Sequence, residues 1–197
     1  MKSSLTIQIS EGLGNQIFMY AFAYALSKSF GYNLYIDNQS GYTRQKNLLR
    51  NHQKYMLDNF NIEGTIAFNN MIYNTSLKRL KKKFLLLIDF FSKNKKFLIE
   101  NKKIIDKKKV AETLIEFNKL KISDRLYVQG NFENELYFSK YKSDLRKIFT
   151  PKQNLIDEKD SIINKIKNSN SISLHIRRNR FSDQDELKTT KNINKSE

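Results

Sequence analysis

Two short stretches of the sequence carry residue types that could bind or transform a charged ligand. The first is EGLGNQ, residues 11–16, in which Gly12 and Gly14 precede Asn15. Glycines permit close backbone approach to a ligand, and an Asn at this point can cap a helix or turn its amide outward to bind one. Because the spacing is not G-x-G-x-x-G, spacing alone favours the structural alternative, in which Asn15 only caps the helix.

The second stretch is HIRR, residues 175–178. A guanidinium such as that of Arg177 or Arg178 can clamp a phosphate through two hydrogen bonds and stays cationic as a pyrophosphate departs. A glycosyl transfer needs such a group where no metal assists. His175 falls on the polar face of the alternating run that leads to the arginines. The alternative, two surface arginines at the end of a strand, fits the pattern equally well.

Metal chemistry finds little support in the sequence. The chain has no Cys and only two His, His52 and His175, and no acidic pair follows a strand in a chelating arrangement. Zinc and the harder divalent cations need clusters of such ligands. The sequence therefore predicts no metal site.

The glycine-bracketed stretch lies inside a β-loop-α-β pattern. Apolar residues alternate over residues 5–9, which predicts a strand with one buried face, and recur at helical spacing over residues 15–30. Gly31 is a typical helix-ending residue, and a second alternating run leads to Asp37. A strand, crossover helix and strand of this length predict a mostly parallel sheet and an α/β fold.

The remaining pattern is less regular. Loops and short elements are predicted over residues 41–63. The further predicted elements are a basic amphipathic helix within 77–121, a strand over 126–129, helices over 137–149 and 155–167, and a strand over 171–176. The last strand ends on the two arginines and belongs in a sheet whose remaining strands are not in this chain.

The composition describes a globular and strongly basic protein. Lys and Arg number 36 against 20 Asp and Glu, a formal charge of +16 that attracts phosphates, nucleic acid or anionic lipid. A coding bias expressed on solvated faces is an equally good explanation of the lysines. The absence of Cys fits a reducing compartment. The longest apolar run, residues 84–88, is far below the roughly 20 residues needed to cross a bilayer, so we expect a cytoplasmic protein that at most lies on a membrane.

Several segments together resemble one enzyme family. Residues 11–21, EGLGNQIFMYA, resemble the G-x-G-N-Q-x-F-x-Y-A opening of the bacterial α-1,2-fucosyltransferases, glycosyltransferase family 11, and residues 175–178 resemble their H-x-R-R motif. Residues 55–62 are similar to the Y-x-L-x-x-F-x-I stretch of the family, and residues 126–149 to the segment that leads toward the arginines. Order and separation agree over residues 1–180.

The resemblance implies an inverting transferase that moves L-fucose from GDP-fucose to the 2-hydroxyl of a terminal galactose. The acceptor would be a surface glycan of the lipopolysaccharide, O-antigen or capsule type, and neither a metal nor another cofactor would be required. The implied fold is a GT-B-like pair of Rossmann domains. Residues 1–168 would form the acceptor-side α/β domain, and residues 169–197 the start of the GDP-sugar-binding domain followed by a tail.

The resemblance also implies roles for particular residues. Arg177, helped by Arg178, would hold the β-phosphate and stabilise the leaving GDP, where charge grows most in the transition state. His175 would help orient the nucleotide. Asn15, with the two glycines before it, would line the cleft near the transferred sugar.

The chain departs from the family pattern in two ways. The family continues its arginine pair as R-R-x-D, whereas this chain has Asn179 and then Arg180. Family members are also longer, and their further residues form most of the nucleotide-binding domain with its guanine pocket. We therefore expect a C-terminally truncated chain with an incomplete donor site.

Two other functions, both non-catalytic, are also open. One is a basic module that binds nucleic acid or an anionic membrane through residues 78–109, and the other is a protein whose N-terminal domain still binds a glycan acceptor or a partner. Nucleic acid is a poor candidate, since the chain has no helix-turn-helix, zinc or RNP-type signature. Its aromatic residues also do not alternate with basic ones as a stacking platform requires. An anionic membrane surface suits this segment better.

Overall fold

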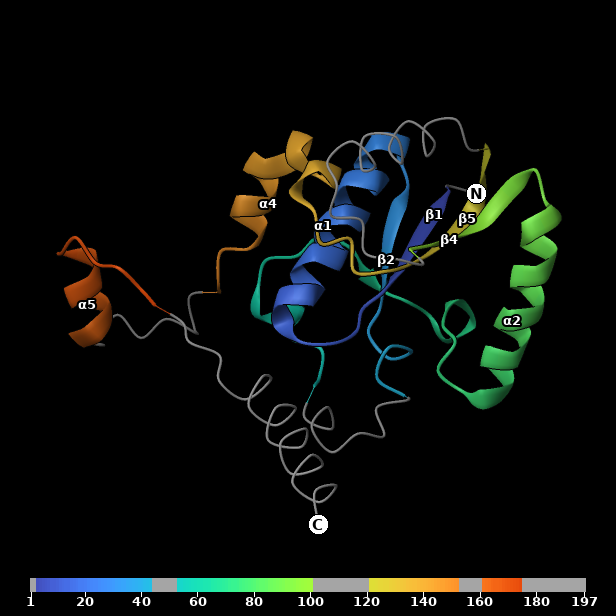
Figure 1. The fold of residues 1–197 in the computed structure, drawn as a ribbon, viewed down its shortest axis with the longest axis horizontal. Helices are drawn as coiled ribbons and strands as arrows, with labels where there is room; N and C mark the ends of the chain where they lie inside the picture. The colour runs from blue at the N-terminus through green and yellow to red at the C-terminus, as the bar shows by residue number, and fades with distance from the viewer. Residues whose placement is uncertain (1–2, 44–52, 101–120, 153–160, 175–197) are drawn as a thin grey trace, which may run out of the picture. The chain divides into compact units, whose positions relative to one another are not determined.

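A computed structural model describes residues 3–43, 53–100, 121–152 and 161–174. It contains a five-stranded sheet with the strand order β3-β2-β1-β5-β4, in which all neighbouring strands run parallel (Figure 1). The strands are β1 (Ser4–Gln8), β2 (Asn33–Asp37), β3 (Thr65–Ile66), β4 (Asn94–Ile99) and β5 (Lys121–Gln129). The predicted α/β fold is confirmed.

The β-α-β opening also forms as predicted. β1 leads into helix α1 (Leu13–Phe30), and α1 leads into β2, which pairs with β1 in parallel with Leu5 opposite Leu34. Gly31 ends the helix in the left-handed region with φ 67°, a conformation that costs glycine little. Its N–H donates to the carbonyl of Ser27 and satisfies one of the last carbonyls of the helix.

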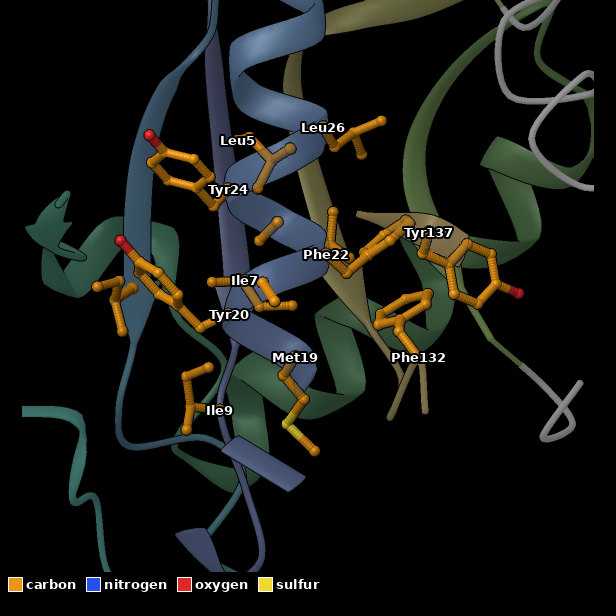
Figure 2. Packing of buried hydrophobic residues seen from close by; sticks show 14 of the residues in the cluster. Leu5, Ile7, Ile9, Met19, Tyr20, Phe22, Tyr24, Leu26, Phe132 and Tyr137 are labelled. Atoms are coloured by element: carbon orange, nitrogen blue, oxygen red, sulfur yellow. The ribbon is translucent and has the colours of Figure 1, made fainter. Parts of the chain in front are cut away.

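Helix α1 is buried on almost every side. One side packs on the sheet residues Leu5 and Ile7, and another packs on the segment after β5 (Figure 2). There the Phe22 ring stacks on Phe132 with centroids 3.8 Å apart and meets Tyr137 edge-on at 5.3 Å. A second layer therefore covers α1 and fixes its position on the sheet.

The opposite face of the sheet is covered as well, so the predicted single buried face of the first strand is wrong. Thr6 points away from α1 yet is buried. Residues 68–73 and helix α2 (Ser76–Phe91) lie over this face and leave a hollow of about 570 Å³ beneath them. Thr6, Tyr35 and Tyr127 line its sheet side.

The predicted basic helix of residues 77–121 is only partly correct. α2 forms its beginning, but Lys95 and Lys96 lie in strand β4 rather than in a helix. Asp89 of α2 holds the two elements together, because its carboxylate accepts hydrogen bonds from the backbone N–H groups of Lys96 (2.7 Å) and Phe97 (3.4 Å). These contacts occupy the outer edge of the edge strand. Residues 101–120 lie outside the described residues.

The region after β5 begins with tighter turns than predicted. The expected helix over 137–149 consists of two 3₁₀ turns, η4 (Glu135–Tyr137) and η5 (Ser139–Tyr141), followed by α4 (Lys142–Ile148). Asn134 caps the first turn by accepting from the N–H of Leu136. In the described part of the chain, no helix combines the length and apolar character needed to span a bilayer.

The chain divides into two compact units, Met1–Ile156 and Asp157–Glu197. In the second unit the predicted helix over 155–167 is represented by α5 (Ser161–Lys167). The predicted strand over 171–176 is wrong where it is described: residues 171–174 form no strand, and the side chains of Ile172 and Leu174 are 97% and 83% exposed. Alternation forms a strand only where a neighbouring strand pairs with it, and the described part of this unit contains no second strand. The predicted boundary after residue 168 stays a prediction.

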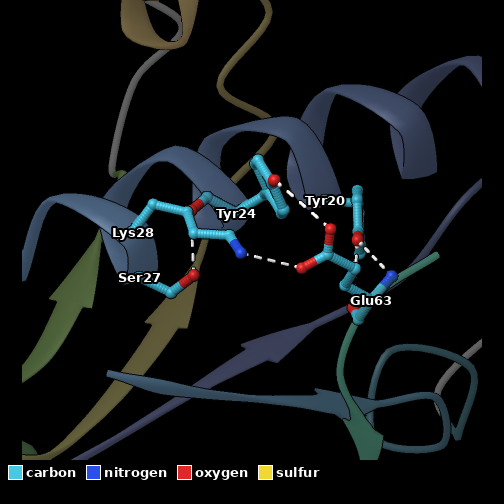
Figure 3. A network of polar contacts seen from close by, with 5 residues as sticks. All are labelled: Tyr20, Tyr24, Ser27, Lys28 and Glu63. Atoms are coloured by element: carbon cyan, nitrogen blue, oxygen red, sulfur yellow. Dashed lines mark hydrogen bonds and ion pairs between the residues drawn. The ribbon is translucent and has the colours of Figure 1, made fainter. Parts of the chain in front are cut away.

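A polar network fastens the segment before β3 to α1 (Figure 3). The Tyr20 hydroxyl donates to the carbonyl of Glu63 (2.9 Å) and accepts from the N–H of the same residue (2.7 Å). The Glu63 carboxylate pairs with Lys28 at 2.8 Å and receives a longer contact, 3.4 Å, from Tyr24. Tyr20 is fully buried, so its two bonds to the backbone are shielded from water.

We predict that Tyr20→Phe lowers the free energy of unfolding by about 1–3 kcal/mol, because it removes the two hydrogen bonds that the buried Tyr20 hydroxyl makes to the backbone of Glu63. Tyr24→Phe is the matched control, because it also removes a tyrosine hydroxyl, but one whose contact with Glu63 is long. This variant should lose less than about 0.5 kcal/mol of unfolding free energy. Urea unfolding followed by circular dichroism measures both. Equal losses of unfolding free energy in the two variants would contradict the role of the Tyr20 hydroxyl in fastening Glu63 to α1.

Candidate functional site at the carboxyl edge of the sheet

The carboxyl ends of the parallel strands meet at one edge of the sheet, where open α/β sheets bind their ligands. The loop after β1 brings Glu11–Gln16 to this edge, and the loop after β2 begins at Asp37. Glu100 follows β4, and Gln129 ends β5. Residues from four strands therefore come together there.

The loop after β1 differs from the prediction in one respect. α1 starts at Leu13 with Gly12 as its N-cap residue, and the N–H of Gln16 bonds to the Gly12 carbonyl, so the expected capping role of Asn15 is wrong. Asn15 instead lies in the first turn, half-buried, and its amide donates to the Glu11 carboxylate. Glu11 has a left-handed backbone, φ 61°, which is uncommon for a residue with a side chain.

Gln16 has a structural role that separates it from its neighbour Asn15. Its side chain is fully buried and donates to the carbonyls of Glu11 (2.9 Å) and Lys54 (2.8 Å). Its Oε1 accepts from the N–H of Met56 at 2.9 Å. The buried amide thus ties the start of α1 to residues 54–56, while the amide of Asn15 stays at the surface of the edge.

Packing within the described residues does not require either glycine of this loop. A methyl group added at Gly12 or Gly14 would meet no atom within 4 Å, and neither residue has a positive φ. Gly14 is also exposed within the first turn of a helix, where Ala would be more favourable. Within the described part of the chain, the space beside both glycines is therefore open.

A buried polar cluster surrounds Asp37 at the end of β2. Its carboxylate accepts from the N–H groups of Gln39 (3.1 Å) and Ser40 (2.9 Å) and lies 2.6 Å from the donating hydroxyl of Tyr127. Asp37 has no exposed surface, so these donors replace its hydration. Burial and the neighbouring Asp37 carboxylate raise the pKa of Tyr127, which keeps its hydroxyl protonated as a donor.

Lys82 of α2 reaches the same edge from the opposite side of the sheet. Its ammonium donates to Gln129 Oε1 at 2.6 Å and lies over the ring of Tyr127, 4.3 Å from the centroid. The side chain is buried, and this desolvation lowers the pKa of Lys82 to about 8, against the opposing effect of the Asp37 carboxylate. The edge therefore holds a desolvated cation close to a buried anion.

Two tyrosines near this edge carry hydrogen-bonding capacity that the described residues do not use. The hydroxyls of Tyr42 and Tyr55 are buried and have no hydrogen-bond partner within the described part of the chain. Burial raises the pKa of Tyr55 to about 12, with a smaller contribution from Asp58. Both groups are therefore neutral donors at physiological pH.

Sequence reasoning found the loop after β1 but missed Asp37, Lys82 and Gln129 as members of the site. A usable signal was present, because β1, β2 and β5 all end on a polar residue after buried apolar ones. Lys82 had no such signal, since it is one of many lysines in its segment. His175, Arg177 and Arg178 lie outside the described residues, so their predicted roles stay predictions. Across the described ranges no group of three or more His, Asp or Glu could hold a metal ion.

Comparison with known proteins identifies a similar enzyme. The chain is 32% identical over 179 residues to the alpha-1,2-colitosyltransferase of Escherichia coli, an alignment that covers 89% of this chain and 54% of that protein. The chain thus spans about half the length of this relative. No family model and no solved structure matches the chain.

We predict that the free energy of unfolding rises with pH between about 8 and 10.5 more steeply in the wild type than in Lys82→Met. In this range the folded chain has lost the Lys82 proton while the unfolded chain still holds it, so a higher pH favours the folded state, by at most about 1.4 kcal/mol per pH unit. Urea unfolding at a series of pH values measures the difference in unfolding free energy between the wild type and Lys82→Met. The tyrosines titrate in both proteins, so their contribution cancels in this difference. Lys83→Met, at an exposed lysine of the same helix, controls for the loss of one charge. Parallel wild-type and Lys82→Met curves would exclude a lowered pKa.

Proposed function

We propose that the chain is the acceptor-side part of a glycosyltransferase that forms an α-1,2 linkage to a terminal galactose of a surface glycan. The observation that carries this proposal is the similarity to an alpha-1,2-colitosyltransferase over 89% of the chain. The parallel sheet fits the first domain of a GT-B-like enzyme. We extend the proposal to a second, nucleotide-binding domain that begins after residue 168.

In the proposed reaction the 2-hydroxyl of galactose attacks the anomeric carbon of a GDP-sugar. The bond from that carbon to the phosphate oxygen breaks, GDP leaves with the bonding electrons, and the hydroxyl proton passes to a general base. Arg177 and Arg178 would neutralise the charge that grows on the β-phosphate, and His175 would orient the nucleotide. Two fixed cations can supply this stabilisation without a metal.

The described residues support an acceptor site in front of the EGLGNQ loop. Gly12 and Gly14 leave open space there, and the Asn15 amide stands beside it. The buried hydroxyls of Tyr42 and Tyr55 have no hydrogen-bond partner among the described residues, and a buried water near the proposed site would satisfy them.

For the donor we propose GDP-fucose. Colitose, the sugar in the name of the relative, is L-fucose without its 3-hydroxyl, so one family of sites could accept either sugar. A site that hydrogen-bonds the 3-hydroxyl of fucose strongly rejects colitose, which lacks this group. An apolar site built for colitose rejects fucose only weakly. A strong preference for GDP-fucose in competition with GDP-colitose would therefore indicate a fucose site.

We predict that the purified chain binds a β-galactoside in isothermal titration calorimetry and that Asn15→Ala weakens this binding by about tenfold, the loss of one hydrogen bond. Asn61→Ala, which removes an exposed amide with one long contact at 3.4 Å, is the matched control and should bind as the wild type does. Absence of heat with any galactoside, with heat for GDP alone, would contradict an acceptor-side assignment.

Incubation with GDP-fucose and the same galactoside tests the reaction itself. Any product should carry the new sugar on the galactose 2-hydroxyl, which nuclear magnetic resonance of the product establishes. Arg177→Ala should then lower the rate by at least about a hundredfold, as expected when a donor to the developing anion is removed. Robust turnover by this chain would also refute the expectation of an incomplete donor site. A different linkage would contradict the proposed activity.

We further predict that Gly14→Ala separates function from stability. The free energy of unfolding should stay equal or rise by up to about 1 kcal/mol, because Ala is favoured over Gly in a helix and the methyl group meets no atom. Galactoside binding should weaken, because the methyl group enters the space proposed for the sugar. Gly41→Ala is the contrasting control, since its methyl group would collide with the Ile9 carbonyl and destabilise the fold. A Gly14→Ala chain with unchanged galactoside affinity would remove this residue from the site.

A further inference from the structure

Helix α2 turns Arg79, Lys82 and Asp89 toward the protein and most of its large apolar residues to the outside. Arg79 donates to Thr43 Oγ1 and to the carbonyl of Asn74, both at 3.0 Å. One turn further on Lys82 reaches the carboxyl edge of the sheet, and Asp89 binds the backbone of β4. These contacts fix the rotation of the helix about its own axis.

The outward side of α2 carries an apolar stripe. Leu77, Leu80, Phe84, Leu87 and Phe91, called here the α2 stripe, follow one another at spacings of three and four residues and so share one side of the helix. Their side chains are 63–84% exposed, and four of them line a shallow apolar hollow with Lys81 and Lys83. Contiguous exposed apolar surface of this kind marks an interaction site.

On α2 and just beyond its end, the exposed charged residues that the structure describes are all basic. Lys81 and Lys83 are exposed on the helix, and Lys93 and Lys96 are exposed just beyond its end. The only acidic residue of α2 is Asp89, which is buried and faces β4. A second copy of this chain, with its own charge of +16, would bring the same lysines against them. The α2 stripe therefore fits a partner that is apolar and anionic at once.

We propose that α2 docks the protein on the surface of an anionic lipid bilayer. The α2 stripe would enter the boundary between headgroups and acyl chains, with the helix parallel to the membrane plane. Lys81 and Lys83 would lay their apolar stems along the stripe and extend their ammonium groups to the lipid phosphates. This inference goes beyond the proposed transfer reaction and does not depend on it.

Flotation with vesicles tests the proposal on the chain as it is. The wild type should float with vesicles of phosphatidylcholine and phosphatidylglycerol and not with phosphatidylcholine alone. Leu80→Gln, Phe84→Gln and Leu87→Gln combined should lower binding by about tenfold or more, because exposed apolar area is lost. Circular dichroism and thermal unfolding verify that this variant folds, which is expected because the three positions are exposed on a helix.

Charge-reversal variants then test whether vesicle binding depends on the lysines beside the α2 stripe or on the net charge of the chain. Lys81→Glu with Lys83→Glu should abolish most of the binding. Lys142→Glu with Lys147→Glu makes the same change in net charge at exposed positions of α4, which packs with α1, and should leave most of the binding intact. Equal losses in the two pairs would overturn the proposal, since binding would then follow net charge alone.

An intrinsic probe reports insertion directly, because the chain has no Trp. The fluorescence of Phe84→Trp should shift to the blue with anionic vesicles and be quenched by brominated acyl chains. Ser143→Trp, at an exposed position of α4, should show neither change. An unshifted Phe84→Trp spectrum overturns the proposal. The proposal is also overturned if the wild-type chain does not bind vesicles but forms dimers in analytical ultracentrifugation, and if the three Gln substitutions disrupt these dimers.

Discussion

The burial of α1 between two layers is the constraint on which the rest of the structure depends. The helix packs on Leu5 and Ile7 of the sheet and is covered on another side by Phe132 and Tyr137. Large aromatic side chains stacked at 3.8 Å leave no room for the helix to shift without opening the core. Its first turn, and with it the glycine loop after β1, is therefore held at the carboxyl edge of the sheet.

The polar groups of that edge support the proposal of a binding site there. Asp37 and Lys82 are both buried, although a desolvated charge is costly even when it is hydrogen-bonded. The loops after the neighbouring strands β1 and β5 each contain a residue with left-handed backbone, Glu11 at φ 61° and Phe132 at φ 49°. Such conformations persist only where the surroundings hold them, and they cluster where a backbone must present groups to a ligand.

The parts of the fold that could be predicted from sequence are those whose signal is local. Alternation, helical spacing and Gly31 were enough for β1, α1 and β2. Strand β4 was missed because its lysines continue the basic composition of α2. The hydrogen bond from the β4 backbone to Asp89 leaves no pattern in the sequence that could predict it. The strand predicted over residues 171–176 failed for the opposite reason, since alternation describes one strand and not the neighbour that must pair with it. The site shows the same limit, because Asp37, Lys82 and Gln129 come from three elements that only the topology brings together.

The orientation of α2 links the site to the outer surface of the molecule. Each residue of a helix turns the side chain by about 100°, so residues two positions before and after an inward-facing residue point nearly the opposite way. Lys82 faces Gln129 and the Tyr127 ring, and this alone directs Leu80 and Phe84 outward. Asp89, two turns later, repeats the constraint by binding the edge of β4, and Leu87 and Phe91 are exposed in consequence. The exposed apolar surface of α2 therefore follows from the inward contacts of the helix. The contacts that bring the Lys82 ammonium to the carboxyl edge of the sheet also direct the apolar side of α2 away from the sheet.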